Sequence, residues 1–145
     1  MKKITTGILA LCFVFALVLS LASCFNTVDA AGLWESATYR RDKSFGKGET
    51  TIYTIVEVAE QSVTFTVKSD KKHLADALVE HELIAGEEGS YGLSVYFVNG
   101  MEADFTRDSA YWAVYIGEEY APVGVCSIEI EDGATYKFVY EIMSW

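Results

Sequence analysis

The residue types best suited to bind a metal ion are His73, Asp76 and Glu80. A helical pattern over 74–81 places them at i, i+3 and i+7. An imidazole and two carboxylates on one helix face could together bind a first-row metal ion. The alternative is the polar outer face of an amphipathic surface helix, and we favour this alternative. Asp104 and Asp108 flank a loop and could hold calcium, but the spacing of a calcium-binding loop is missing.

Catalytic motifs are absent from the sequence, which has no nucleophile elbow and no Gly-rich phosphate loop. The two histidines, His73 and His81, are eight residues apart. On a helix they would lie about 80° apart and could not share one small site. Glu80 and Glu82 do not share a helix face either. We therefore expect a protein that is not an enzyme.

Aromatic residues gather in the second half of the chain, and they indicate binding more than any other feature does. The set consists of Tyr91, Tyr96, Phe105, Tyr111, Trp112, Tyr115 and Tyr120. Tyr and Trp offer large rigid contact areas and keep one polar atom for hydrogen bonding. Such a surface suits a flat ligand, such as a corrin or porphyrin, or a protein partner. The alternative is that the rings fill a small β core, and we favour it for Trp112 and Tyr115.

Tyr120 differs from the other aromatic residues because it follows Gly117 in an expected loop. With the Asn99-Gly100 turn it forms the predicted binding edge. The predicted ligand-contact residues are Asn99, Gly100, Tyr111, Trp112 and Tyr120. They fit either the capture of a small ligand or the interaction of a cell-surface module with a protein or polymer. Metal binding through the helix residues is a third hypothesis.

The N-terminus has the features of an export signal. Lys2 and Lys3 precede an almost unbroken apolar run from Ile8 to Leu21. This run is shorter than the roughly 20 residues that a membrane span needs. The sequence Leu21-Ala22-Ser23-Cys24 that follows resembles the lipobox of bacterial lipoproteins, in which the cysteine receives a diacylglycerol. We predict a signal peptide over 1–23 and an outward-facing membrane anchor at Cys24. The alternative is secretion after cleavage behind Ala30.

Charge and cysteine content narrow the function further. Removing residues 1–23 takes two lysines and no acidic residue from the 11 basic and 21 acidic residues, which leaves a formal charge of −12. A chain this acidic is not expected to bind nucleic acid, and it should stand off an anionic membrane. With Cys24 lipidated, Cys126 is unpaired and is expected to be buried as a small hydrophobic residue. A Cys24–Cys126 disulfide is the alternative.

Hydrophobic periodicity divides the rest of the chain into elements. Residues 24–49 are weakly patterned and are predicted to be a tether. Residues 51–58 and 63–67 alternate with period two and predict a hairpin, followed by a helix of about three turns that ends near Gly86. Residues 93–98 and 111–116 predict further strands, the second covered on both faces. A mixed sheet of about five to six strands under one helix is an α+β, β-grasp-like fold for residues 50–145.

The C-terminal residues predict a second hairpin. A three-residue loop of Glu131, Asp132 and Gly133 would pair Cys126 with Phe138, so that apolar residues face one another. Gly133 would then take the left-handed conformation that such loops need.

Several short stretches are similar, in their order and spacing, to a bacterial family of unknown function that resembles the C-terminal domain of transcobalamin and intrinsic factor. They are Ser62 to Val67, Ala75 to Leu78, Leu83 to Gly86, Val98 to Gly100, Tyr111 to Ala121, Gly124-Val125 and Glu131 to Gly133. Together they cover nearly all of residues 50–142. Cys126 departs from the family, whose members usually have a polar residue there.

The resemblance implies a β-grasp domain of a kind often found on secreted or lipid-anchored bacterial proteins. It also implies cobalamin as a ligand, because in the vertebrate vitamin carriers this domain forms half of a cobalamin cleft. A larger helical domain forms the other half.

The lipidation hypothesis predicts that the mature protein begins at Cys24 and carries a diacylglycerol on that thiol. Intact-mass measurement of protein purified from cell membranes checks this directly. A mature N-terminus at Ala31 with no adduct would contradict it.

Overall fold

The structure is a computed structural model in which residues 30–144 are described. The predicted signal peptide and Cys24 lie outside the described residues. Between 30 and 144, no helix has the length and apolar character needed to cross a bilayer.

The helical elements are α2 (Ala30–Glu35), α3 (Leu74–Val79), α4 (Phe105–Asp108) and the 3₁₀ turn η1 (Val125–Ser127). The strands are β1 (Lys43–Phe45), β2 (Thr50–Val58), β3 (Gln61–Ser69), β4 (Ile84–Gly89), β5 (Gly92–Val98), β6 (Met101–Glu102), β7 (Ala110–Ile116), β8 (Glu119–Tyr120) and β9 (Thr135–Ile142).

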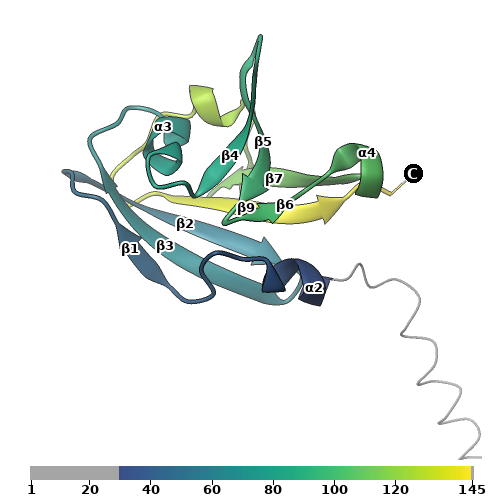
Figure 1. Cartoon of the computed structure of the whole chain (residues 1–145). Helices are drawn as coiled ribbons and strands as arrows, with labels where there is room; N and C mark the ends of the chain where they lie inside the picture. The colour runs from purple at the N-terminus through teal and green to yellow at the C-terminus, as the bar shows by residue number, and fades with distance from the viewer. Residues whose placement is uncertain (1–29, 145) are drawn as a thin grey trace, which may run out of the picture.

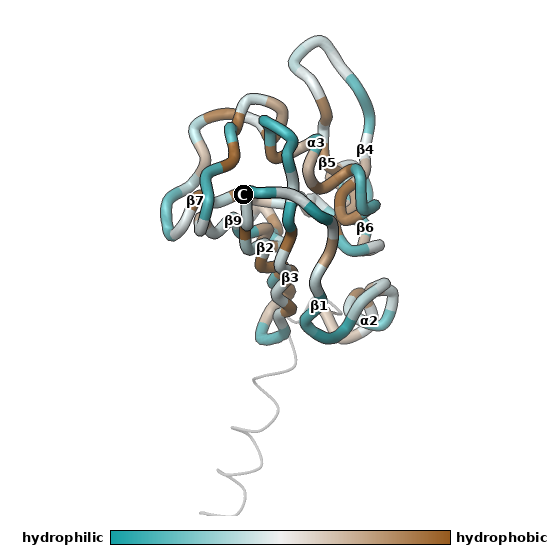
Figure 2. The backbone as a smooth tube through the Cα atoms, turned by 90° about the vertical axis from the view of Figure 1, so that its left-hand side faces the viewer, coloured by the Kyte–Doolittle hydropathy of each residue, from teal (hydrophilic) through white to brown (hydrophobic). Residues whose placement is uncertain are grey.

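These strands form two sheets. The larger is a six-stranded mixed sheet in the order β1-β3-β2-β9-β7-β8, and the smaller is a three-stranded sheet in the order β4-β5-β6. Figure 1 shows α3 and the smaller sheet packed over one face of the larger sheet. The side view in Figure 2 places the labelled helices and the smaller sheet on that same side. The predicted α+β class is confirmed, and the smaller sheet is an addition that periodicity did not predict.

The N-terminal hairpin agrees with its prediction. β2 and β3 pair antiparallel from Thr50↔Ser69 to Val58↔Gln61, and Ala59 turns the chain with a φ of 53°. Alternate residues of both strands face the covered side and are fully buried there, namely Ile52, Val56, Val58, Val63, Phe65 and Val67. Period-two alternation was a reliable guide here because both partners are local and one face is apolar.

The predicted C-terminal hairpin is wrong. β9 pairs parallel with β2 and antiparallel with β7, and Cys126 lies in η1 rather than in a strand. Gly133 has the expected left-handed φ of 79°. However, its loop bonds to β2, since the Asp132 carboxylate accepts from Thr51 N at 2.7 Å and Gly133 N donates to Thr51 O at 2.7 Å. These bonds guide β9 alongside β2, so the strand pairs with a partner about 80 residues away rather than with its neighbour in sequence.

The layer above the sheet differs in detail from the prediction. α3 has only six residues, of which Leu74, Ala75, Ala77 and Leu78 are buried. It ends well before Gly86 because Glu82 has a φ of 55° and Leu83 N bonds back to Leu78 O at 3.0 Å. Such a left-handed residue closes a helix and starts the next element. The chain then enters the β4–β5 hairpin, which stands away from the body in Figure 1.

The segment 30–49 packs on the domain, whereas a tether was expected. β1 pairs parallel with β3, and the rings of Tyr39, Phe45 and Phe65 meet edge-to-face with centroids 5.3 to 5.9 Å apart. Burial of aromatic rings supplies the driving force that holds this segment in place. The folded unit therefore extends N-terminally to about residue 30 and does not begin at residue 50.

Asn99 fastens this segment to the smaller sheet. Its side-chain oxygen accepts from Tyr39 N at 2.9 Å, and its amide nitrogen donates to Tyr39 O at 2.7 Å. Its backbone bonds to Leu83 O and Thr38 N, both at 2.8 Å. Asn99 is 1% exposed and has a φ of 52°, which Asn tolerates better than most residues.

Cys126 is half-buried against the core, and its sulfur accepts a hydrogen bond from Leu93 N at 3.3 Å. It packs against the core as expected for a small hydrophobic residue, but it is only partly buried and does not lie in a strand.

Replacing Asn99 with Ala should lower the free energy of unfolding by roughly 2 kcal/mol or more, because two buried backbone groups of Tyr39 lose their partner. Urea unfolding followed by tryptophan fluorescence measures the change. Asn99→Gly also removes the side-chain hydrogen bonds, but Gly adopts a positive φ without strain. Comparison of the two variants therefore separates the loss of the hydrogen bonds from backbone strain in Asn99→Ala. Tyr91→Ala at an exposed hairpin tip should change stability by less than about 0.5 kcal/mol. Equal unfolding midpoints for Asn99→Ala and the unsubstituted chain would contradict the proposed clamp.

Candidate functional site

The three metal-ligand candidates are spread over both ends of α3. His73 precedes the helix as its N-cap, Asp76 lies within it, and Glu80 is its C-cap. His73 Nδ1 and Asp76 Oδ2 are 3.9 Å apart, but the Glu80 carboxylate lies 4.0 Å from Nε2 of His81. Among residues 30–144, no three His, Cys, Asp or Glu side chains come together as metal ligands. Residues at i and i+7 are separated by about 10 Å along a helix, which explains why spacing alone was misleading.

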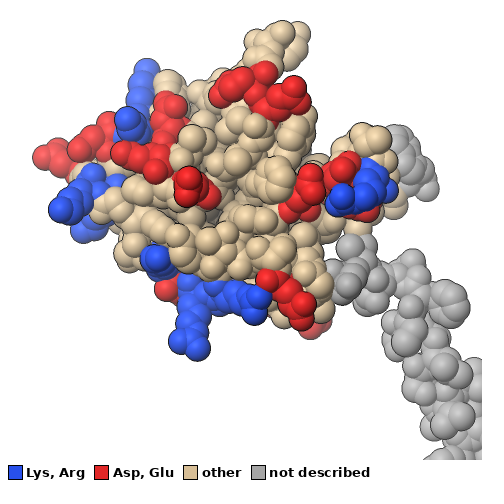
Figure 3. Space-filling model, viewed as in Figure 1, with Lys and Arg blue, Asp and Glu red and all other residues tan. Residues whose placement is uncertain are grey.

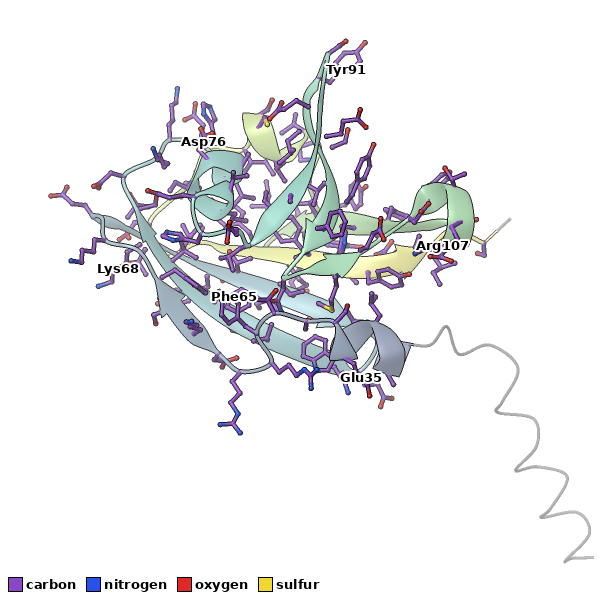
Figure 4. The ribbon with its side chains drawn as sticks, in the orientation of Figure 1. Glu35, Phe65, Lys68, Asp76, Tyr91 and Arg107 are labelled. Atoms are coloured by element: carbon purple, nitrogen blue, oxygen red, sulfur yellow. The ribbon has the colours of Figure 1, made fainter. Side chains whose placement is uncertain are left out.

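The alternative calcium ligands surround a cation that the chain supplies itself. Arg107 lies 2.8 Å from the carboxylate of Asp108, 3.8 Å from that of Asp104 and 3.9 Å from that of Glu102. The Asp104 carboxylate also caps α4 by accepting from Arg107 N at 2.9 Å. The guanidinium therefore holds these carboxylates around α4, where Figure 4 labels it.

The predicted ligand-contact residues do not form one site. Asn99 is buried and bonded within the protein, and a Cβ on Gly100 would come within 2.4 Å of Thr38 Oγ1. Trp112 faces the core, where its indole Nε1 donates to Met101 O at 3.3 Å and its ring meets that of Tyr140 at 5.5 Å. Because successive strand residues point to opposite faces, Tyr111 lies on the other side of the sheet.

Tyr111 and Tyr120 belong to a group on the open face of the larger sheet, which we call the tyrosine cluster: Tyr111, Tyr115, Tyr120 and Glu141. The hydroxyls of Tyr111 and Tyr115 donate to the two oxygens of Glu141 at 2.6 and 2.8 Å. The Tyr115 ring meets that of Tyr120 edge-to-face at 5.5 Å. α3 and the smaller sheet lie over the other face of the larger sheet. The prediction that β7 is covered on both sides therefore holds only in part: Trp112 and Ala113 are both buried, but Tyr111 and Tyr115 are partly exposed.

The carboxylate of Glu141 changes the acidity of its two phenols. Its hydrogen bond, with smaller contributions from desolvation and charge repulsion, raises the pKa of Tyr111 to about 12. The same causes raise the pKa of Tyr115. The two hydrogen bonds to Glu141 fix the positions of both phenol hydroxyls.

A second aromatic surface lies where β5 and β6 meet α4. Tyr96, Glu102, Ala103, Asp104, Phe105 and Thr106 line a hollow of about 330 Å³, which we call the aromatic hollow. The rings of Tyr96 and Phe105 are 43% and 50% exposed, so both offer apolar area to a ligand. A hydrogen bond of 2.8 Å from Ala103 N to Tyr96 O holds the two walls together.

Sequence reasoning placed Tyr96 and Phe105 among the aromatic residues but did not select them. Asn99 and Gly100 provided a usable signal, because both have positive φ and close the β5–β6 turn as predicted. A tight turn brings the residues on its two sides together. Tyr96 precedes the turn and Phe105 follows it closely, so their approach could have been inferred from the Asn-Gly pair.

The β4–β5 hairpin rises beside this hollow. Figure 4 shows Tyr91 at its tip, pointing away from the body, and the side chain is fully exposed. Phe97, on the same strand as Tyr96, is 38% exposed. Exposed aromatic side chains are therefore concentrated on and around β5, and this part of the surface is the strongest candidate for binding.

Comparison with known proteins shows the fold. No protein-family model matches the chain, and no curated protein matches it. A solved structure from Ruminococcus gnavus, described as a "putative metal binding protein", is similar with a TM-score of 0.62 and 25% identity over 66% of this chain and 100% of that one. Haptocorrin in complex with Cbi is similar with a TM-score of 0.55 and 18% identity over 68% of this chain. The match covers only 26% of haptocorrin. The domain thus has the fold of one part of haptocorrin, which supports the resemblance to transcobalamin-like proteins at the level of the fold.

Replacing Glu141 with Gln should lower the pKa of Tyr111 from about 12 towards the usual 10, because the neutral amide no longer favours the protonated phenol. Ultraviolet titration of tyrosinate measures this. The folded-state pKa is raised, so the stabilising contribution is complete below about pH 10 and is lost as the pH rises towards 12. Glu118→Gln, a highly exposed carboxylate, is the control. Identical titration curves for the two variants would refute the assignment.

Proposed function

We propose that the chain is an exported, non-enzymatic ligand-binding module and that its ligand contacts the aromatic hollow. The observation that carries this proposal is the pair of half-exposed rings, Tyr96 and Phe105, on the walls of one hollow. Single exposed rings are common, but exposed apolar surface that is gathered in one place marks interaction sites. The two similar structures, one described as metal-binding and one solved with Cbi, support a ligand-binding function without specifying the ligand.

The shape of the hollow favours a flat ligand held by one edge. Pockets that enclose a drug-sized ligand measure about 300–1,000 Å³. At about 330 Å³ the hollow is at the lower limit, so it would hold part of a corrin or porphyrin and leave the rest exposed. The resemblance to half of a cobalamin cleft leads to the same expectation, namely that this domain provides one wall of a larger site.

The charges around the hollow favour a ligand with a metal of its own over a bare metal ion. Glu102 and Asp104 line the hollow, but Arg107 neutralises part of their charge. A tetrapyrrole carries its metal in the macrocycle and needs aromatic walls and hydrogen-bond acceptors rather than three protein ligands. We therefore propose a corrinoid or another tetrapyrrole as the ligand class.

We propose further that a lipid on Cys24 anchors the protein to the outer side of the cell membrane. The order of the positive N-terminus, the apolar run and the lipobox-like sequence supports this location. Simple secretion is the alternative, and it leaves the ligand-binding proposal unchanged.

The tyrosine cluster supports a second candidate function, the binding of a protein or polymer partner. Tyr120 is 61% exposed beside two tyrosines fixed by Glu141 on an open sheet face. Rigid tyrosines with free ring surface are common in protein interfaces. This surface lies on the opposite side of the sheet from the aromatic hollow, so the two functions can be tested separately.

Adding cobinamide, cobalamin or haem to the purified protein should shift the visible absorbance of the ligand that binds. Tyr96→Ala and Phe105→Ala should each weaken that binding by about tenfold, because each removes a stacking ring. Tyr53→Ala is the matched control, since Tyr53 is also an exposed tyrosine (39%) but lies on the far face of the sheet.

Two outcomes would contradict the proposal. Absence of any absorbance change or heat of binding at micromolar concentrations would exclude capture of these three compounds. Binding that is lost in Tyr120→Ala but kept in Tyr96→Ala would move the site to the tyrosine cluster.

A further inference from the structure

Basic side chains gather at one edge of this acidic protein. Arg40, Arg41, Lys43 and Lys47 form what we call the basic edge, and only Asp42 interrupts it with a negative charge. They are four of the nine basic residues that follow Cys24. Figure 3 shows Lys and Arg atoms grouped below β1 and the loop that leads from α2, with Asp and Glu atoms beside them and further Lys and Arg atoms at the upper left and at the right.

The charges of the basic edge are not neutralised within the domain. The ion pairs in the described part of the chain involve Lys72, Arg107 and Lys137, besides two histidines, and none involves the basic edge. The Asp42 carboxylate is directed to the sheet, where it accepts a hydrogen bond from Thr64 N at 2.9 Å. Within the domain the Arg40 guanidinium donates to Glu35 O and the Lys43 ammonium lies over the Tyr39 ring, but neither interaction neutralises the positive charge. The charges of the basic edge are thus available to an external anion.

The backbone of this edge is held in place. The Lys43 ammonium lies 4.2 Å from the centre of the Tyr39 ring, and the two backbone groups of Tyr39 bond to Asn99. Residues 37–43 line a shallow, open hollow of about 500 Å³, with Arg40, Arg41 and Lys43 around it. A phosphate group fits such a hollow, and guanidinium groups bind phosphate well.

Protection of an exposed strand edge is a competing explanation for these residues. Lysine on an edge strand discourages pairing with another chain, and β1 is an edge strand. That explanation accounts for Lys43, but Arg40 and Arg41 precede the strand. Lys47 follows the strand, so three of the four charges lie outside it and are not explained by strand protection.

We propose that the basic edge docks the domain onto anionic phospholipid head groups, with lipid phosphates in the hollow lined by residues 37–43. This inference rests on the membrane anchor of the proposed function, because Arg40 follows Cys24 by only sixteen residues. A lipid on Cys24 would keep the basic edge close to the bilayer. Each basic side chain near an anionic surface strengthens membrane affinity by about fivefold.

Docking through the basic edge would also set the direction in which the proposed ligand-binding surface faces. In both Figure 1 and Figure 2 the β4–β5 hairpin lies at the end of the molecule opposite β1 and α2. Docking through the basic edge therefore directs the hairpin, with Tyr91 at its tip, away from the membrane. The negative net charge does not prevent this, because charges farther than about 8–10 Å are screened at physiological salt. From its net charge, the whole domain was expected to stand off the membrane. The proposal instead has one edge of the domain in contact with the membrane and the hairpin directed away from it.

The experiment uses the full chain reconstituted in vesicles of phosphatidylcholine, with or without phosphatidylglycerol. An amine-reactive reagent labels the lysines, and peptide mass spectrometry gives the rate at each one. Lys43 and Lys47 should react at least about threefold more slowly on anionic than on neutral vesicles, and high salt should restore their rates. Lys71 and Lys72, which precede α3, should react equally on both.

A pair of matched variants tests the assignment. Arg40→Gln with Arg41→Gln should abolish the protection of Lys43 and Lys47, whereas Lys71→Gln with Lys72→Gln should preserve it. Equal rates on the two kinds of vesicle, protection that survives in the first variant, or equal protection of Lys71 and Lys72 would overturn the proposal. Flotation on neutral vesicles measures whether the lipid anchor holds the protein on the membrane, and absorbance titration measures ligand binding. A negative result in either of these measurements can therefore be told apart from a lack of lysine protection at the basic edge.

Discussion

The parallel pairing of β2 with β9 is the contact on which the rest of the structure depends. It joins an N-terminal hairpin to a C-terminal strand that is about 80 residues away, from Tyr53↔Thr135 to Glu57↔Val139. Closing so long a loop is entropically costly, and the pairing is supported by burial of Val56 beside Phe138 on the covered face. Once this pairing exists, the sheet has one continuous apolar face. α3 and the smaller sheet pack there, which leaves the tyrosine cluster on the opposite face uncovered.

Asn99 connects the aromatic hollow with the basic edge. It stands at the turn between Tyr96 and Phe105, and it is bonded to Tyr39 beside the basic edge. The turn sets the approach of the two aromatic rings, and the side chain holds the N-terminal segment against the domain. Asn99 therefore positions both surfaces and need not contact a ligand itself. The position of the N-terminal segment and the shape of the hollow thus depend on this one residue.

The parts of the fold that sequence reasoning predicted well are local. The β2–β3 hairpin, β5 and the Asn99-Gly100 turn follow from alternation and turn chemistry within short windows. The pairing of Cys126 with Phe138 was wrong because it assumed that neighbouring segments pair, whereas Asp132 and Gly133 bond to β2. Likewise, Tyr39 and Phe45 looked like tether residues because their partner, Phe65, is distant in sequence.

For the candidate site, the abundance of aromatic residues was a better guide to a binding function than the five residues that were predicted to contact the ligand. Aromatic content indicated binding, but the side of the sheet on which each ring lies depends on strand register. Trp112 and Tyr111 were grouped together by residue type, although as successive residues of one strand they face opposite ways. The hollow between Tyr96 and Phe105 depends on α4, a helix of four residues that is too short to leave a periodic signal.

The central claim is that this domain binds a flat ligand at the aromatic hollow. A two-dimensional amide NMR spectrum of the labelled protein, recorded while cobinamide is added, tests the claim most directly. We expect shifts confined to the hairpin and to residues 92–106, with the signals of β7 and β9 on the open face unchanged. An unchanged spectrum, or shifts confined to Tyr111, Tyr115, Tyr120 and Glu141, would contradict it.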